Sequence, residues 1–246
     1  WAMPALELIG TLWSGFNGWL GTYWGTNAFK LHSDYLGLLT GVLALAALTR
    51  LPKGLERRRT WFWLGAVIIG ILWVLGGQTP FYRLPYTLLP GIAKTRAPSM
   101  MWGQVSLCVA VLAAMGVSRI ESMAAEERRR WALRVGIAVG TAALLFVAAS
   151  GRLIPNIAPA ERLDAAYAAI AGARWGILLG AGTVIAFAVV AWRAPRWTGV
   201  AAVAMLVLDL GIQGRRFIVI DPRGDSFFAA DAVVRAIERD AAGSAQ

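Results

Sequence analysis

Six long apolar blocks, separated by short charged or proline-rich connections, dominate this sequence. The blocks are continuous, with neither the alternation of a half-buried strand nor the single apolar stripe of a surface helix. A helix that crosses a membrane needs about 20 mainly apolar residues, within a range of about 17–25. The pattern therefore predicts an all-α, polytopic helical membrane protein with about six spans, which we place at Tyr35–Thr49, Trp61–Gly77, Ser99–Ser118, Trp131–Ser150, Trp175–Trp192 and Trp197–Gln213.

Composition agrees with a membrane protein and excludes several other classes. The 246 residues are 58% apolar and 15% charged, whereas soluble domains are about half apolar and a quarter charged. The net charge of +10 would suit nucleic acid, but Lys and Arg also collect in the short cytoplasmic loops of membrane proteins, so we expect no nucleic-acid partner. His32 and Cys108 are the single members of their kinds. An intrachain disulfide is thereby excluded, and neither a metal site nor a cofactor is indicated.

Two dense basic clusters suggest an orientation. They read "LPKGLERRRT" and "EERRRWALR" and lie in short connections between predicted spans, where the positive-inside rule applies best. We therefore expect Arg50–Thr60 and Arg119–Arg130 on the cytoplasmic side, and the connections 78–98 and 151–174 outside. Arg215 and Arg216, after the last span, weigh against this assignment.

The two flanks of the predicted bundle differ in character. Residues 1–34 are rich in Gly and Trp and are predicted to form an outer-face loop or interfacial helix. Residues 214–246 look like the start of an extracytoplasmic domain, with a short strand at Phe217–Ile220 and an amphipathic helix at Ala229–Arg239. Because the chain lacks an initiator Met and ends in a polar run, we expect it to be a piece of a longer protein.

The connection "GGQTPFYRLPYTLLPGIAKTRAPSMMWG", from Gly76 to Gly103, has an unusual composition. It holds four prolines and three cations and no acid. The prolines prevent a continuous helix, and irregular backbone near a membrane is tolerated where it lines a cavity. Its cations could bind a phosphate-bearing headgroup, or could extend toward lipid phosphates without a specific ligand. The candidate substrate-binding residues here are Tyr82, Arg83, Lys94 and Arg96, with Tyr86 also at headgroup level.

Two acids at the outer side complete the candidates. Asp209 lies inside the last predicted span, where an ionisable residue is a functional hypothesis by default. It could line the active cavity or, as we favour, pair with Arg215, Arg83 or Arg96. Asp34 could contact a sugar hydroxyl, but is better interpreted, with Ser33, as the cap of the following helix.

Small-residue pairs also occur in the predicted spans, as Gly136-xxx-Gly140 and Gly176-xxx-Gly180. This spacing permits close helix approach but is common by chance, so we assign it no packing role.

The region from Ser33 to Ile120 resembles the bacterial YfhO-like membrane proteins. That family's pattern is roughly N-T-P-L-Y-x-L, L-P-G, F-R-x-P-x-R and a span ending in A-G-x-G. The corresponding stretches here are Gln78–Leu84, Leu89–Gly91, Thr95–Met100 and Ala114–Val117, with Met100 in place of the second basic residue. "LDLGIQGRRFIVIDP" and the residues after it also resemble the family's last span and exit into an outer domain.

The resemblance implies a multi-spanning glycosyltransferase of the GT-C type in the bacterial inner (cytoplasmic) membrane. Such a protein moves a sugar from a polyprenyl-phosphate donor to a cell-envelope acceptor on the outer face. The family's acidic catalytic motif lies in a first outer loop that we expect to precede this chain, so no catalytic residue is assigned. A transporter or flippase, and a non-enzymatic scaffold for envelope assembly, remain alternatives.

Overall fold

The computed structural model describes residues 2–27, 34–49, 53–94, 97–215 and 234–235. Its contacts divide the chain into two units, Trp1–Gly214 and Arg215–Gln246. The first unit holds all of the helices discussed below, so residues 2–27 belong to the same unit as the predicted spans. The predicted strand at 217–220, and all of the predicted helix at 229–239 except residues 234–235, lie outside the described residues.

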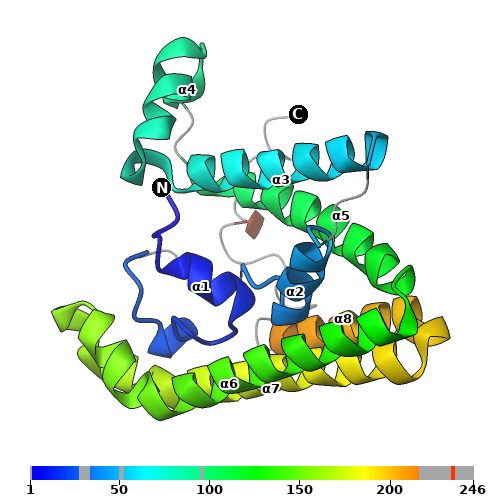
Figure 1. Cartoon of the computed structure of the whole chain (residues 1–246). Coiled ribbons are helices and arrows are strands. Elements are labelled where there is room, and N and C mark those ends of the chain that lie inside the picture. The colour runs from blue at the N-terminus through cyan, green and yellow to red at the C-terminus, as the bar shows by residue number, and fades with distance from the viewer. Residues whose placement is uncertain (1, 28–33, 50–52, 95–96, 216–233, 236–246) are drawn as a thin grey trace. The chain divides into compact units, whose positions relative to one another are not determined.

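The first unit is a bundle of α-helices with short 3₁₀ turns between them, and the described residues contain no strand (Figure 1). The α-helices are α1 (Glu7–Leu12), α2 (Leu38–Ala46), α3 (Leu55–Val74), α4 (Arg83–Leu88), α5 (Trp102–Glu121), α6 (Ala125–Ile157), α7 (Leu163–Arg193) and α8 (Thr198–Gly214). The 3₁₀ turns are η1 (Leu20–Thr22), η2 (Gly76–Gln78), η3 (Pro80–Tyr82), η4 (Ile92–Lys94), η5 (Pro98–Met101), η6 (Ala160–Arg162) and η7 (Pro195–Trp197).

Four segments are long and apolar enough to cross a membrane: 98–121, 125–157, 160–193 and 195–214. The chain is therefore an all-α helical membrane protein with several membrane-crossing helices. The two longest, α6 and α7, have 33 and 31 residues, which at 1.5 Å per residue gives about 50 and 46 Å. Both exceed the hydrocarbon thickness of about 30 Å.

The expected count of six spans is not reached among the described residues. The span predicted at Tyr35–Thr49 contains only α2, whose nine residues reach about 14 Å, too short to cross alone. The span predicted at Trp61–Gly77 is part of α3, whose first turns hold Arg57, Arg58 and Arg59. Its uncharged part, Trp61–Val74, reaches about 21 Å.

Two predicted connections are also largely helical. The segment 151–174, expected as an outer loop, continues α6 to Ile157 and starts α7 at Leu163. Alanine-rich sequence explains the early start of α7, because Ala has the highest intrinsic helix propensity. The basic cluster at 55–60 likewise forms the start of α3 and not a loop, since Arg and Glu are also good helix formers.

The helices share two ends. At one end, helices α3, α6 and α8 begin and helices α5 and α7 finish. We call it the basic end, because it carries Arg57–Arg59, Arg119, Arg128–Arg130, Arg193 and Arg196. The other end, which we call the opposite end, holds the start of α5 and the ends of α3 and α8. In Figure 1 the basic end lies to the right, where α3 begins and α5 finishes.

Residues 2–27 pack into the helices. Phe16 and Trp24 are buried in one apolar cluster with Phe146 of α6 and Ala173 of α7, and Met3 is buried against Val74 and Val105. This N-terminal stretch is therefore integrated into the bundle at its opposite end. Its side of the membrane stays a prediction.

The glycine pair of α7 marks where that stretch packs. A Cβ added at Gly176 would lie 1.8 Å from the carbonyl oxygen of Ser14, and one at Gly180 would lie 3.3 Å from Leu38. A Cβ at Gly136 would meet nothing within 4 Å. Assigning no packing role was therefore wrong for Gly176 and Gly180, because Ser14 and Leu38 lie directly on that face of α7.

Candidate functional site

A cavity of about 360 Å³ lies between α2, α3 and α5. Its lining is almost entirely aliphatic and includes Leu38, Val67, Ile71, Val105, Val109 and Leu112. Ligand sites in proteins range from about 300 to 1,000 Å³. The lining offers no polar partner along its length, so it suits a hydrocarbon chain far better than a sugar or an ion.

We call the end of this cavity nearest the start of α5 its mouth. Trp102 and Thr11 both line the cavity. The indole Nε1 of Trp102 donates a hydrogen bond of 3.2 Å to the backbone oxygen of Asp34, and the N–H of Leu36 donates one of 2.6 Å to the oxygen of Thr11. Asp34 is therefore fixed at the mouth.

Asp34 does not cap α2. The residue before that helix is Gly37, at φ 95°, and no side chain caps it. A positive φ of this size favours glycine, which has no Cβ. The cap interpretation of Asp34 is wrong, because three non-helical residues separate it from the helix.

The proline-rich connection leads to the same mouth. Its last turn, η5, runs directly into Trp102 at the start of α5, and Met101 packs against the apolar cluster around Val74 and Val105. The prolines do prevent a continuous helix, as predicted, but the described residues of this stretch form a chain of short helical turns and not a loop. Pro80 and Pro98 begin turns, a position where the missing N–H costs nothing.

The candidate residues of this connection lie at its surface. Tyr82 is half-buried between Trp73 and Tyr86, with ring centroids 5.8 and 6.2 Å away. Arg83 and Lys94 are exposed. Leu84 and Leu88 are exposed beside them, so α4 presents aromatic, aliphatic and cationic side chains together, as interfacial helices do. Arg96 lies outside the described residues.

Asp209 of α8 is buried, with 2% of its surface exposed. Its Oδ2 accepts a hydrogen bond of 2.8 Å from the hydroxyl of Tyr35. Its Oδ1 is buried without a hydrogen-bond partner, and so are both amide atoms of Gln213, one turn further along α8. A Cβ at Gly37 would come within 3.1 Å of Oδ2.

The expected pairing of Asp209 with an arginine is therefore wrong for Arg83, since Asp209 forms no ion pair with a described residue of its own unit, and it stays a prediction for Arg96 and Arg215. Figure 1 shows α4, which carries Arg83, far from α8. The tyrosine replaces the arginine because a phenol can reach a buried carboxylate without burying a second charge. Asp209 also lines an apolar groove of about 480 Å³ between α7 and α8, beside Trp175 and Thr183.

A second buried acid was missed from the sequence. Glu7 of α1 is 1% exposed and accepts a hydrogen bond from the hydroxyl of Tyr23, which in turn accepts one of 3.0 Å from the N–H of Asn27. Burial, followed by the bond to Glu7, raises the pKa of Tyr23 well above its ordinary value. A single acid inside the apolar run "PALELIG" was the available signal.

The structure thus brings only some of the candidates together. Asp34 lies at the cavity mouth, and its neighbour Tyr35 reaches Asp209, so one short stretch connects the cavity to the buried acid. Tyr82, Arg83 and Lys94 lie on the connection that leads to the mouth, but not beside Asp209. Among the described residues, no group of three or more His, Cys, Asp or Glu side chains could hold a metal ion.

Comparison of the chain with models of protein families, with curated proteins and with solved structures finds no match.

Proposed function

We propose that this chain is the membrane part of a GT-C type glycosyltransferase of the bacterial inner membrane. It would hold a polyprenyl-phosphate sugar donor while the sugar passes to a cell-envelope acceptor on the outer face. The proposal rests on the resemblance of Gln78–Leu84, Leu89–Gly91 and Thr95–Met100 to YfhO-like proteins, and on the cavity between α2, α3 and α5.

The cavity is the observation that carries the proposal. An isoprenoid tail needs an apolar space within the membrane-embedded part of the protein, and its phosphate needs donors at one end of that space. The aliphatic lining supplies the first requirement. The mouth, with Trp102, Asp34 and the cationic connection, supplies groups for the phosphate and the sugar. In this arrangement Arg96, Arg83 and Lys94 are the candidate phosphate ligands, Asp34 faces the sugar, and Tyr82 anchors the connection at the headgroup level.

A transporter has less support. Among the described residues, the four candidate spans bury five polar side chains, Arg128, Ser150, Thr198, Asp209 and Gln213, which are too few to line a hydrophilic path. A scaffold would need no cavity of this kind.

The test uses a photoactivatable polyprenyl phosphate, with and without an attached sugar, and the chain reconstituted in lipid nanodiscs. We expect cross-links in α2, α3 and α5. Ala44 lines the cavity, so Ala44→Phe should fill it and reduce cross-linking about tenfold, since overpacking costs about 1–3 kcal/mol and 1.4 kcal/mol is tenfold.

The matched control is Ala142→Phe, at an exposed position of α6, which should leave cross-linking unchanged. If the probe reacts equally with both variants, or labels only the outer surface of α6 and α8, the cavity does not hold the donor and the proposal fails.

A further inference from the structure

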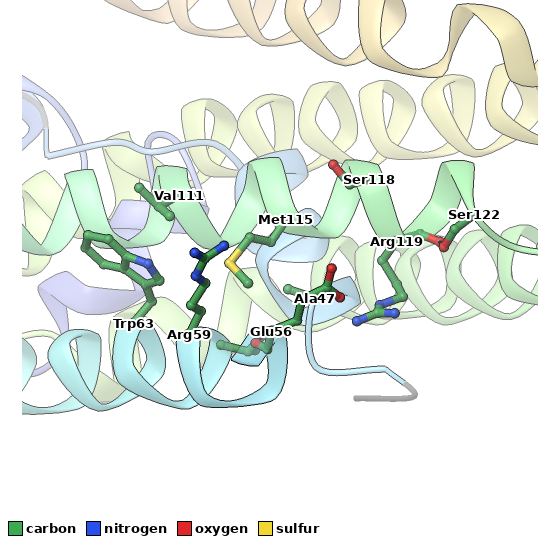
Figure 2. A pocket seen from close by; sticks show the side chains of 10 residues that line it. Ala47, Glu56, Arg59, Trp63, Val111, Met115, Ser118, Arg119 and Ser122 are labelled. Atoms are coloured by element: carbon green, nitrogen blue, oxygen red, sulfur yellow. Dashed lines mark hydrogen bonds between the residues drawn. The ribbon is translucent and has the colours of Figure 1, made fainter. Parts of the chain in front are cut away.

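A second cavity, of about 550 Å³, lies at the basic end between α3 and α5. Figure 2 shows Arg59 extending from α3 toward α5, Arg119 extending from α5 toward α3, and Glu56 between them. This cavity is separate from the aliphatic one, since Ala47, Trp63 and Met115 line it and do not line the other.

The two arginines are available for a ligand. Neither makes a hydrogen bond or an ion pair with any described residue, Glu56 included. The hydroxyls nearby are already used as donors within their helices: Thr60 donates to the oxygen of Glu56 at 3.0 Å, and Ser122 donates to that of Arg119 at 2.8 Å. The guanidinium groups are therefore the free donors of this cavity, and they favour oxyanions with two acceptor atoms.

The net charge of the lining indicates the charge of the anion that the cavity would bind. Arg59 and Arg119 contribute two positive charges and Glu56 one negative charge, so the lining carries one positive charge. A phosphate diester carries one negative charge and would neutralise it. Glu56 would oppose a more highly charged anion through like-charge repulsion.

The lining also changes from the basic end inward. From the basic end inward, α5 contributes Ser122, Arg119 and Ser118, then Met115 and Val111, with Trp63 of α3 beside them (Figure 2). On α5, polar residues are thus followed by apolar ones, and Figure 2 shows Arg59 of α3 between Trp63 and Met115. The order on α5 matches a phospholipid, whose headgroup lies at the interface and whose acyl chains point inward. A soluble phosphate has no use for the apolar half.

We propose that this cavity binds the phosphate group of an anionic phospholipid from the leaflet at the basic end, with Arg59 and Arg119 as ligands. Basic pockets between membrane helices are known to take such headgroups. The site is independent of the proposed glycosyl transfer, since it lies at the other end of the bundle.

The test measures lipid binding to the full chain in detergent by native mass spectrometry, with phosphatidylglycerol and phosphatidylcholine as probes. Wild type should bind phosphatidylglycerol more tightly than phosphatidylcholine. Arg59→Ala and Arg119→Ala should each weaken phosphatidylglycerol binding about tenfold, because a charge-assisted hydrogen bond contributes at about that level. Glu56→Gln should strengthen it by removing the repulsion, an outcome that does not depend on a loss of folding.

Arg129→Ala is the matched control. Arg129 lies at the same end, pairs with Glu126 and does not line the cavity, so its loss should leave binding unchanged. The proposal is overturned if Arg129→Ala weakens binding as much as Arg59→Ala does, or if Glu56→Gln has no effect. A third arm adds inorganic phosphate without lipid. Stabilisation of the wild type by phosphate alone, lost in Arg119→Ala, would overturn the lipid as the source of the phosphate.

Discussion

The two ends of the bundle differ in their acids, because the acids that are buried among the described residues, Glu7 and Asp209, lie at the opposite end. At the basic end, Glu126 is 57% exposed and makes ion pairs of 3.6 and 3.1 Å with Arg129 and Arg130. At the opposite end, Asp209 and Glu7 are 2% and 1% exposed and are bound by the hydroxyls of Tyr35 and Tyr23. This exposed acid of the basic end is solvated, whereas the two buried acids of the opposite end are built into the packing.

We infer from this difference that the exposed charges of the basic end anchor the protein, whereas the buried acids of the opposite end help to build the candidate site. An exposed ion pair contributes little to stability, because water competes with it at almost the same strength. A buried carboxylate is costly unless hydrogen bonds compensate for its lost water, so the chain around it must be positioned closely. The stretch from Tyr35 to Leu38, the N-terminal residues and the cavity mouth all lie at the end where this positioning occurs.

The largest expected effect comes from Gly176, where the N-terminal stretch lies on α7. Gly176→Ala would place a methyl group 1.8 Å from the oxygen of Ser14 and should lower the free energy of unfolding by about 3 kcal/mol, since backbone cannot move aside as a side chain can. Chemical denaturation of the reconstituted chain gives the value.

Gly182→Ala is the control on the same helix. Its added Cβ would meet nothing within 4 Å, so it should be neutral or stabilising by up to about 1 kcal/mol. If Gly176→Ala and Gly182→Ala lowered the free energy of unfolding equally, the N-terminal stretch would not pack on α7. The contrast between the two ends would then not hold.

An intermediate effect is expected at Tyr35. Tyr35→Phe removes the hydroxyl that donates to Asp209 and should cost about 1 kcal/mol of unfolding free energy, the usual size for a hydrogen bond in a membrane bundle. Tyr167→Phe, at a side chain that is 59% exposed on α7, should cost nothing measurable. In a double-mutant cycle with Asp209→Asn, additive losses would show that the two groups do not interact.

The smallest effect is expected at the basic end. Glu126→Gln removes the partner of Arg129 and Arg130, and should change the unfolding free energy by less than about 0.5 kcal/mol. Repeating the measurement at high salt should reduce even that, since exposed charges are screened. If Glu126→Gln lowered the free energy of unfolding as much as Tyr35→Phe does, exposed and buried acids would not differ in their contribution to stability.

The sequence predicted helices and membrane character because both depend on local properties. Long apolar runs such as those of α6 and α7 leave few alternatives to a membrane-crossing helix. It did not predict where helices end, because Ala-rich and Arg-rich connections extend α7 and α3 beyond the apolar blocks. It also overestimated α2, since apolar content alone does not reveal that Gly37 and the three residues before it are not helical.

The candidate site was predictable only in part, for a similar reason. The acids Asp34 and Asp209 stood out as isolated charges beside or within apolar sequence. Their partners did not, because Trp102 and Tyr35 meet them across 68 and 174 residues of chain. The search for an arginine beside Asp209 followed charge complementarity, whereas burial favoured a neutral donor.

The central claim is that the two ends lie on opposite sides of the membrane, with the basic end in the cytoplasm and the cavity mouth outside. Cys108 is the single cysteine of the chain, so Cys108→Ser gives a background for labelling with an impermeant thiol reagent. Lys53→Cys reports on the basic end and Ala160→Cys on the opposite end, and both positions are exposed. The account predicts that Ala160→Cys reacts in intact cells and that Lys53→Cys reacts only after the cells are permeabilised. Labelling of both from outside, or the reverse pattern, would contradict it.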